Sequence, residues 1–482
     1  MNHRLAATLA VATVALHATA GHAQPDGYAP HPQDEDFDTL IITGTRIPTP
    51  ASQEGRSVSI VTADDIELRQ QRFLFDALTA VPGVQVTRSG SFGALASVSI
   101  RGLSSSQTLA VQDGIVLNNP ATFDNSFNFA NFDTSDIERI EVIRGAQSTL
   151  YGSDAIGGVI NIVTKDGRDG LGGAGFLEGG SFGSFRGAAS LYGGSDVLSG
   201  RATISGTTTS GFSSADAANG NTEDDGFDTI AVSAKGRYQL ASRLQFEAVL
   251  RYQDSKNEFD SFTFQPVDGD EVGKTQELTV GGFATLQTFA GKLGHRASVS
   301  YTRVDQLNLS DGIASFDSLG TRIAYEYQAT AKPVAGITLV AGAEYDVQES
   351  QTRVGFGGNQ KIKTSSGYGL LQVQPHERVT LSAGVRYDTS GDFGSETTLS
   401  GAGAVKLPLV GFVLRGSYSE GFRAPTAGEL GFNPNLFAEF GTGWDIGLSR
   451  ALLNGRVHVS ATYFSQHVRD LIAFDLPAFT FI

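Results

Sequence analysis

The chain has 482 residues, among them 59 glycines, 31 phenylalanines and 13 tyrosines, and it has no cysteine. Glycine at this frequency disfavours a helical protein and favours many strands and turns. The absence of cysteine excludes disulfides and thiolate metal sites. Aspartate and glutamate (51) outnumber lysine and arginine (35), so the net charge is −16. This charge disfavours a nucleic-acid partner, because phosphate groups bind basic faces.

The first residues have the pattern of a secretory signal peptide. Arg4 precedes an apolar run over residues 5–20, and Gly21 and Ala23 are small residues at the positions that a signal peptidase reads. The run is shorter than the ~20 residues of a membrane-spanning helix. We therefore expect residues 1–23 to be removed after export, with cleavage after Ala23.

Residues 24–56 are expected to form a flexible arm, since their first part is rich in proline and acidic residues and cannot bury a core. A short apolar segment interrupts this arm and comprises Asp38, Thr39, Leu40, Ile41, Ile42 and Thr43. One interpretation is an edge strand of the following domain. The other is a tethered strand that adds to the sheet edge of a partner protein through main-chain hydrogen bonds.

The pattern of residues 57–166 predicts a small mixed domain. A strand over 58–61 leads to Thr62, a suitable N-cap for a helix over 66–80 that is interrupted near Phe73. Two short strands, at 98–102 and 109–114, end in glycine turns. Residues 137–165 then form a strand, a compact glycine-rich turn and a second strand that starts after Gly157 and Gly158.

Long alternating segments follow Lys165. Apolar and polar residues alternate over 244–252, 323–329, 337–345, 381–387 and 457–463, and these stretches often end in an aromatic residue. We expect each to belong to a strand of roughly nine or ten residues. Short links such as 241–243 and longer polar links at 213–225 and 257–274 join such segments. This pattern predicts an antiparallel transmembrane β-barrel. A soluble β-sandwich or propeller is the alternative.

One motif is misleading. Residues 170–175 satisfy the G-x-G-x-x-G pattern of dinucleotide-binding proteins, but that pattern requires a helix after it. The residues that follow are too rich in glycine for a helix, so we interpret the motif as the first barrel strand. No nucleophile, base and carboxylate arrangement is visible in the sequence, and we predict neither an enzyme nor a catalytic cofactor.

The segment at 137–165, together with residues 78–83, 99–102 and 113–114, resembles the plug domain of TonB-dependent outer-membrane receptors. Residues 419–426, 429–430 and 433–436 resemble the signature of this family's barrel. The resemblance implies a mixed α/β plug at 57–166, a barrel at 167–482 and a location in the outer membrane of a Gram-negative bacterium. It also implies that residues 38–44 are the TonB box. The implied partners are TonB with its inner-membrane energising complex, a small-molecule ligand and outer-membrane lipid.

The barrel is expected to be incomplete at its C-terminal end. Family barrels close with about 22 strands, whereas the residues after Asp166 supply only about 15 at the usual strand length. Open sheet edges are not tolerated in lipid. We therefore expect a truncated or frameshifted sequence, or the product of a pseudogene.

The acidic loops are a candidate calcium site, because calcium prefers about six to eight oxygen ligands. Their layout resembles the cobalamin-receptor subgroup of the family, which by position implies Glu223, Asp225, Asp260 and Asp270 as ligands, with Asp216 as a further candidate. The resemblance therefore implies uptake of cobalamin or a related corrinoid. A ferric siderophore or haem receptor of the same class is the alternative, and so is a passive channel or adhesin barrel without energy coupling.

Overall fold

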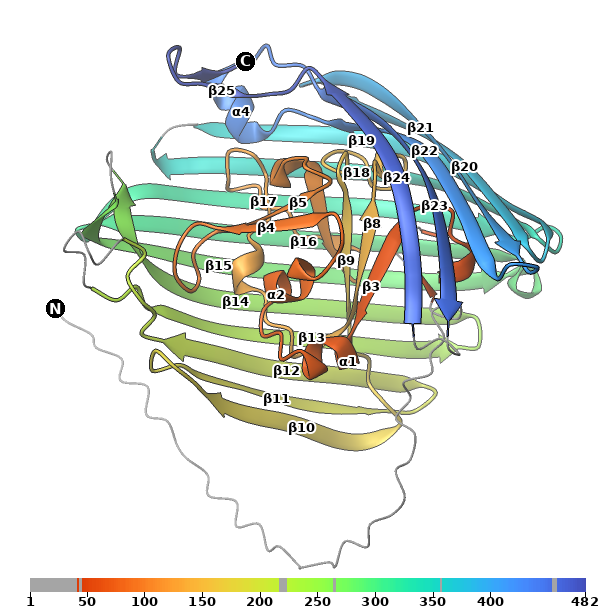
Figure 1. Cartoon of the computed structure of the whole chain (residues 1–482), viewed down its shortest axis with the longest axis horizontal. Coiled ribbons are helices and arrows are strands. Elements are labelled where there is room, and N and C mark those ends of the chain that lie inside the picture. The colour runs from red at the N-terminus through yellow and green to blue at the C-terminus, as the bar shows by residue number, and fades with distance from the viewer. Residues whose placement is uncertain (1–40, 43–45, 216–222, 263–265, 356–357, 453–456) are drawn as a thin grey trace, which may run out of the picture.

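The computed structural model describes residues 41–42, 46–215, 223–262, 266–355, 358–452 and 457–482. A small mixed domain, the plug, lies within the curve of a large antiparallel sheet, the wall (Figure 1). No helix in the described part of the chain is long and apolar enough to cross a membrane.

The plug is built on one five-stranded sheet and one hairpin. Its main sheet has the strand order β3-β8-β9-β6-β7, in which β6 and β9 are parallel, and β4 pairs with β5. The fully buried side chains of Leu74, Leu78, Ile140 and Ile160 form part of its core. In chain order its elements are β3 (Val58–Thr62), α1 (Ala63–Leu68), α2 (Leu74–Thr79), β4 (Val84–Arg88), β5 (Ala96–Ile100), β6 (Thr108–Gln112), β7 (Ile115–Val116), β8 (Ile137–Arg144), α3 (Ser148–Tyr151) and β9 (Gly158–Thr164).

The predicted N-cap at Thr62 and the interruption near Phe73 are confirmed, but the helix begins at Ala63, three residues before the predicted start. The Thr62 hydroxyl accepts a hydrogen bond from the Asp65 N–H at 3.2 Å, and the Asp65 carboxylate accepts one from the Thr62 N–H at 3.2 Å. This capping box satisfies two backbone donors at the start of α1. Phe73 is buried and separates α1 from α2.

The wall is a 15-stranded sheet in which every strand pairs with its neighbours in sequence, so the predicted number of strands is confirmed for the described residues. Its strands are β10 (Gly170–Gly179), β11 (Phe185–Gly194), β12 (Leu198–Thr209), β13 (Phe227–Ala241), β14 (Leu244–Phe262), β15 (Pro266–Thr288), β16 (Leu293–Ser310), β17 (Ile313–Ala331), β18 (Ile337–Val354), β19 (Asn359–His376), β20 (Val379–Ser390), β21 (Gly394–Leu407), β22 (Phe412–Arg423), β23 (Glu439–Leu452) and β24 (Val457–Arg469).

The two faces of the wall differ in polarity. In β20, Leu381 and Tyr387 are each 49% exposed on the outer face, whereas Arg386 and Asp388 are 2% and 1% exposed on the face toward the plug. The Arg386 guanidinium donates to the Asp388 carboxylate at 2.9 Å. An apolar outer face and a charged inner face are the reverse of a soluble β-sandwich and match a membrane barrel.

Two expectations about the wall were wrong. Strands β13 to β19 are longer than the nine or ten residues predicted, because strand pairing continues beyond the apolar band. Most of the predicted polar link at 257–274 is hairpin, with Asn257 paired to Gly273. Polar side chains fit a strand wherever both faces contact water.

The interpretation of Gly170 as the start of a barrel strand is confirmed.

The remaining elements are short, and two of the 3-10 turns, Ser105–Gln107 and Phe129–Asn131, lie within the plug. The 3-10 turns are Ala51–Gln53, Ser105–Gln107, Phe129–Asn131 and Phe289–Gly291. The remaining strands and helix are β1 (Ile41–Ile42), β2 (Thr49–Pro50), α4 (Ala427–Phe432), β25 (Phe474–Asp475) and β26 (Thr480–Phe481).

Candidate functional site: the plug, its N-terminal strand and the wall

The predicted partner-binding segment is described only at Ile41 and Ile42. These residues form β1, which pairs antiparallel with β2 so that Ile42 faces Thr49 and Ile41 faces Pro50. The Ile42 side chain is fully buried and lines a cavity of about 260 Å³ between the plug and the last wall strands. The other predicted members, Asp38, Thr39, Leu40 and Thr43, lie outside the described residues.

The segment after β1 is attached to three wall strands. The Arg46 guanidinium pairs with Glu326 of β17 and lies over the Tyr151 ring, 4.8 Å from its centroid. Gln372 of β19 donates to the Thr49 hydroxyl at 3.2 Å. In β22, the Arg415 guanidinium donates to the carbonyls of Ala51 and Glu54, at 3.0 Å each. The segment from Arg46 to Glu54, which leads into the plug, is therefore attached to the wall before β3 begins.

Replacing Arg415 by alanine is expected to loosen this attachment. The change removes the donor to two backbone carbonyls, and a hydrogen bond from a charged group contributes about 1.5–3 kcal/mol. We expect amide hydrogen exchange over residues 46–56 to become at least about tenfold faster. Arg450→Ala is the matched control, because Arg450 is exposed and lies over the Phe412 ring instead. Unchanged exchange in the Arg415 variant would contradict this role.

Two plug arginines line the cavity between the plug and the last wall strands. Arg101, after β5, pairs with Asp445 of β23 at 3.0 Å, and both side chains are 3% exposed. Arg144, at the end of β8, donates to the Ser59 hydroxyl at 2.7 Å and to the Pro82 carbonyl at 2.8 Å. Burial, together with the nearby Arg101 guanidinium, lowers the pKa of Arg144 to about 10.

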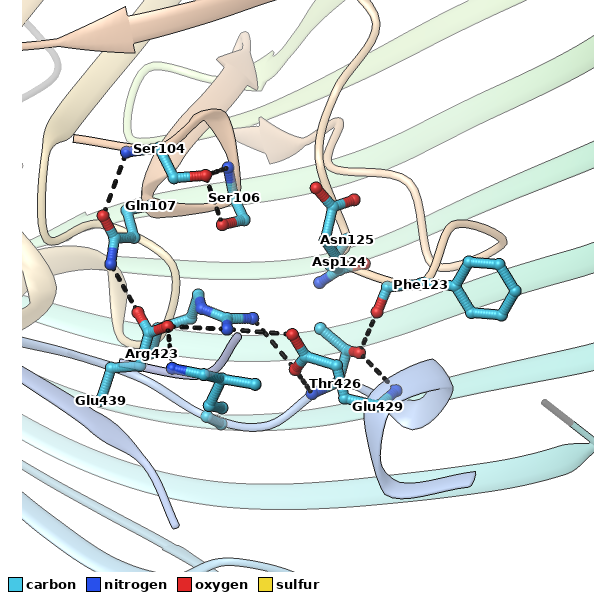
Figure 2. A network of polar contacts seen from close by, with 12 residues as sticks. Ser104, Ser106, Gln107, Phe123, Asp124, Asn125, Arg423, Thr426, Glu429 and Glu439 are labelled. Carbon is cyan, nitrogen blue, oxygen red and sulfur yellow. Dashed lines mark hydrogen bonds and ion pairs between the residues drawn. The ribbon is translucent and has the colours of Figure 1, made fainter. Parts of the chain in front are cut away.

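A buried polar network joins two plug segments, at residues 104–107 and at Phe123, to the wall where β22 ends and β23 begins (Figure 2). The Gln107 side-chain amide of the plug donates to Glu439 at 2.6 Å. Arg423 donates to the same carboxylate at 2.8 Å and to both oxygens of Glu429, at 3.0 and 3.1 Å. After β22, the Thr426 hydroxyl donates a hydrogen bond to the backbone carbonyl of Phe123 in the plug. The contacts thus run from the plug through the wall and back to the plug.

The same network fixes α4 over the plug. The Thr426 hydroxyl accepts from the Glu429 N–H at 3.1 Å and the Glu429 carboxylate accepts from the Thr426 N–H at 2.8 Å, which is a capping box. A Cβ on Gly428 would lie 2.8 Å from the Phe123 Cα, so only glycine allows this approach. The position of α4 and that of the plug loop at Phe123 therefore depend on each other.

Three acidic side chains come together where β12, β13 and β14 meet. Carboxylate oxygens of Glu223, Asp225 and Asp260 lie within 4.8 Å of one another. Because β14 and β22 run in the same direction, this group, at the end of β14, lies at the opposite end of the wall from Arg415, at the start of β22. Asp270 lies outside the group, and Asp216 lies outside the described residues.

The acidic group is held mainly by backbone donors. Asp225 is 1% exposed and accepts from the Ser214 N–H at 2.6 Å, and Asp260 accepts from the Ala215 N–H. Burial, with a further contribution from the Asp260 carboxylate, raises the pKa of Asp225. The Asp260 Oδ1 atom is buried and has no hydrogen-bond partner in the described part of the chain. Such a set of oxygens, with one buried oxygen still free to bind, fits a hard cation such as calcium.

Sequence reasoning did not identify the arginines of the interface. Arg101 directly follows β5, Arg144 is the last residue of β8, and each precedes a glycine with positive φ. A charged residue at the end of an apolar strand was therefore the available signal. The partners of these arginines could not be read from the sequence, since Arg101 and Asp445 are 344 positions apart.

Comparison with known proteins agrees with this architecture. A family model described as the TonB-dependent receptor plug domain matches residues 50–159, and one described as the TonB-dependent receptor-like β-barrel matches residues 269–481. The chain belongs to the TonB-dependent receptor family. This receptor is therefore an outer-membrane transport protein of a Gram-negative bacterium, and its family is a class of transporters and not of enzymes. The family also implies TonB and a small-molecule ligand as partners.

Individual relatives of this receptor carry different ligands. The vitamin B12 transporter BtuB of Vibrio vulnificus is 27% identical over 481 residues, which cover 94% of this chain and 74% of that protein. The solved siderophore receptor PirA of Acinetobacter baumannii has a TM-score of 0.74 at 18% identity over 86% of this chain and 71% of its own. The ferripyoverdine receptor of Pseudomonas aeruginosa has a TM-score of 0.74 at 16% identity over 92% of this chain and 67% of its own.

Proposed function

We propose that this receptor takes up cobalamin or a related corrinoid across the outer membrane. The observation that carries the proposal is the 27% identity, over 94% of the chain, to the vitamin B12 transporter of Vibrio vulnificus. The siderophore receptor PirA of Acinetobacter baumannii and the ferripyoverdine receptor are only 18% and 16% identical, so they support the fold and do not favour a ferric siderophore over a corrinoid.

In the proposed cycle, the ligand binds at the end of the barrel that carries the acidic group and α4, where it contacts the plug. TonB pairs with the strand at residues 38–43 and pulls on it from the other end. The pull is transmitted through Arg46 and the attached segment to β3, which is an edge strand of the plug sheet. In this proposal the driving energy enters through TonB.

Glu223, Asp225 and Asp260 are proposed to hold a structural calcium ion. A bound calcium supplies positive charge that offsets three clustered carboxylates. The residues themselves connect the segment before β13 with the end of β14. Their grouping is expected to order the ligand-side loops. Asp270 is not proposed as a ligand, because it lies outside the group.

The test is cyanocobalamin binding to the full chain, measured with and without calcium. We expect calcium to increase the affinity of the wild-type chain for cyanocobalamin by about tenfold or more, since ordering of loops before binding lowers its entropic cost. Asp260→Asn should remove this increase, whereas Asp270→Asn, outside the group, should retain it. Absence of cyanocobalamin binding, or binding of haem or a ferric siderophore in its place, would contradict the corrinoid proposal. Binding without calcium dependence would contradict the calcium site alone.

A further inference from the structure

The plug turn at residues 89–95 joins β4 to β5 and docks on the wall segment that carries Asp225. The Ser91 N–H donates to the Ser214 hydroxyl at 3.0 Å, and the Ser91 hydroxyl donates to the backbone carbonyl of Asp225 at 3.2 Å. The Ser91 hydroxyl also accepts from the Phe212 N–H at 3.3 Å. Ser91 is fully buried, so all three hydrogen bonds are shielded from water.

Close packing surrounds these hydrogen bonds. The Phe92 ring of the plug meets the Phe212 ring edge-on, with centroids 6.0 Å apart. Gly93 has a φ of +74°, and a Cβ there would lie 2.1 Å from the Phe227 ring. A Cβ on Gly211 would lie 1.8 Å from the Asp225 carbonyl oxygen. The plug turn and the segment from 211 to 227 therefore fit together with no room for an added side chain at these positions.

Ser214 connects the plug to the acidic group itself. Its hydroxyl accepts from Ser91, and its N–H donates to the Asp225 carboxylate at 2.6 Å. Ser91 therefore fixes Asp225 from two sides, through the Asp225 carbonyl and through Ser214. If the turn moved away from the wall, the hydrogen bond to the Asp225 carbonyl would be lost, and Ser214, which donates to the Asp225 carboxylate, would lose its bond to the plug.

We propose that Ser91 of the plug positions Asp225, so that the Glu223, Asp225 and Asp260 group binds a divalent cation more tightly when the plug is seated than when it is displaced. Since coupling between two sites is reciprocal, a bound cation also holds the plug turn against the wall. Movement of the plug during transport then weakens cation binding. This inference rests on the cation site of the proposed function.

The test measures calcium binding directly, by calorimetry on the full chain in detergent. Ser91→Ala removes both hydrogen bonds of the hydroxyl, to the Asp225 carbonyl and from the Phe212 N–H, and keeps the backbone N–H bond to Ser214. We expect it to weaken calcium binding about fivefold, because of the two lost bonds only the one to Asp225 acts on the acidic group. Gly93→Ala should weaken it at least as much, because the added methyl group displaces the turn from Phe227. Ser135→Ala is the matched control: Ser135 also lies in the plug, but its backbone contacts Asp133 and Lys165 instead of the acidic group. We expect wild-type affinity in that control.

Hydrogen exchange gives the second readout. Calcium should slow amide exchange over residues 89–95 in the wild-type chain, and Ser91→Ala should abolish that protection. Calcium affinity of Ser91→Ala equal to that of the wild type would overturn the inference and leave the cation site intact. Calcium binding without protection of the turn would do the same. Absence of calcium binding to the wild-type chain would overturn both the cation site and the inference.

Discussion

Leu40→Pro is expected to reduce uptake of cyanocobalamin to background while its binding to the receptor is unchanged. Proline removes a backbone N–H and fixes φ, so a strand that contains it loses main-chain pairing with a partner sheet. Leu40 directly precedes β1, which is already extended in its pairing with Thr49 and Pro50. The change acts on the energy input and leaves the ligand end of the barrel intact.

The resting pairing of β1 favours exchange with a partner. Pro50 faces Ile41 in the register and has no N–H to donate, so β2 offers fewer donors than a full strand of another protein. A competing strand can therefore form more main-chain hydrogen bonds with β1 than β2 does. Burial of Ile42 opposes release, and burial of such a side chain contributes roughly 1.5–3 kcal/mol.

Uptake and binding are measured in the same cells with labelled cyanocobalamin. Leu40→Ala keeps the N–H and is the matched control, for which we expect uptake near that of the wild type. Persistent uptake in the proline variant would refute the assignment of the TonB box. Loss of binding as well as uptake would show that the change disrupts the fold instead of the coupling.

Local patterns predicted the plug and the wall well. The cap at Thr62, the interruption at Phe73 and the alternation at 381–387 each depend on neighbours in sequence, and each is confirmed. Strand ends were predicted poorly beside residue 257, because the sequence marks the apolar band and not the water-exposed part of a hairpin.

Residues brought together by strand pairing could be predicted only in part. The family layout gave Glu223, Asp225 and Asp260, which the fold groups. It also gave Asp270, but this side chain is exposed and lies outside the group. The neighbouring Glu271 carboxylate instead accepts a hydrogen bond from the Ser310 hydroxyl at 2.7 Å. Successive residues of a strand face opposite sides, so one position of register decides which carboxylate joins a group. Sequence spacing does not fix that register.

Arg423→Ala is expected to destabilise the receptor by about 3–5 kcal/mol, the usual effect of removing one partner from a buried ion pair. The Arg423 side chain is 2% exposed, and it lies between two carboxylates that are equally buried, those of Glu429 and Glu439. Without the guanidinium these two negative charges face each other in a region of low dielectric. The measurement is the free energy of unfolding from urea titration in detergent. Arg378→Ala, an exposed arginine beside Glu377, should change it by less than about 0.5 kcal/mol.

The double variant Arg423→Met with Glu439→Gln separates charge from packing. It removes one carboxylate charge together with the guanidinium, and replacement of buried ion pairs by neutral groups of similar volume is often tolerated. We expect it to recover at least half of the stability lost in Arg423→Ala. Hydrogen exchange over residues 104–107 should follow the same order, because Gln107 bonds Glu439 from the plug side (Figure 2). A loss below about 1 kcal/mol in Arg423→Ala, with unchanged exchange at Gln107, would mean that the network does not hold the plug to the wall.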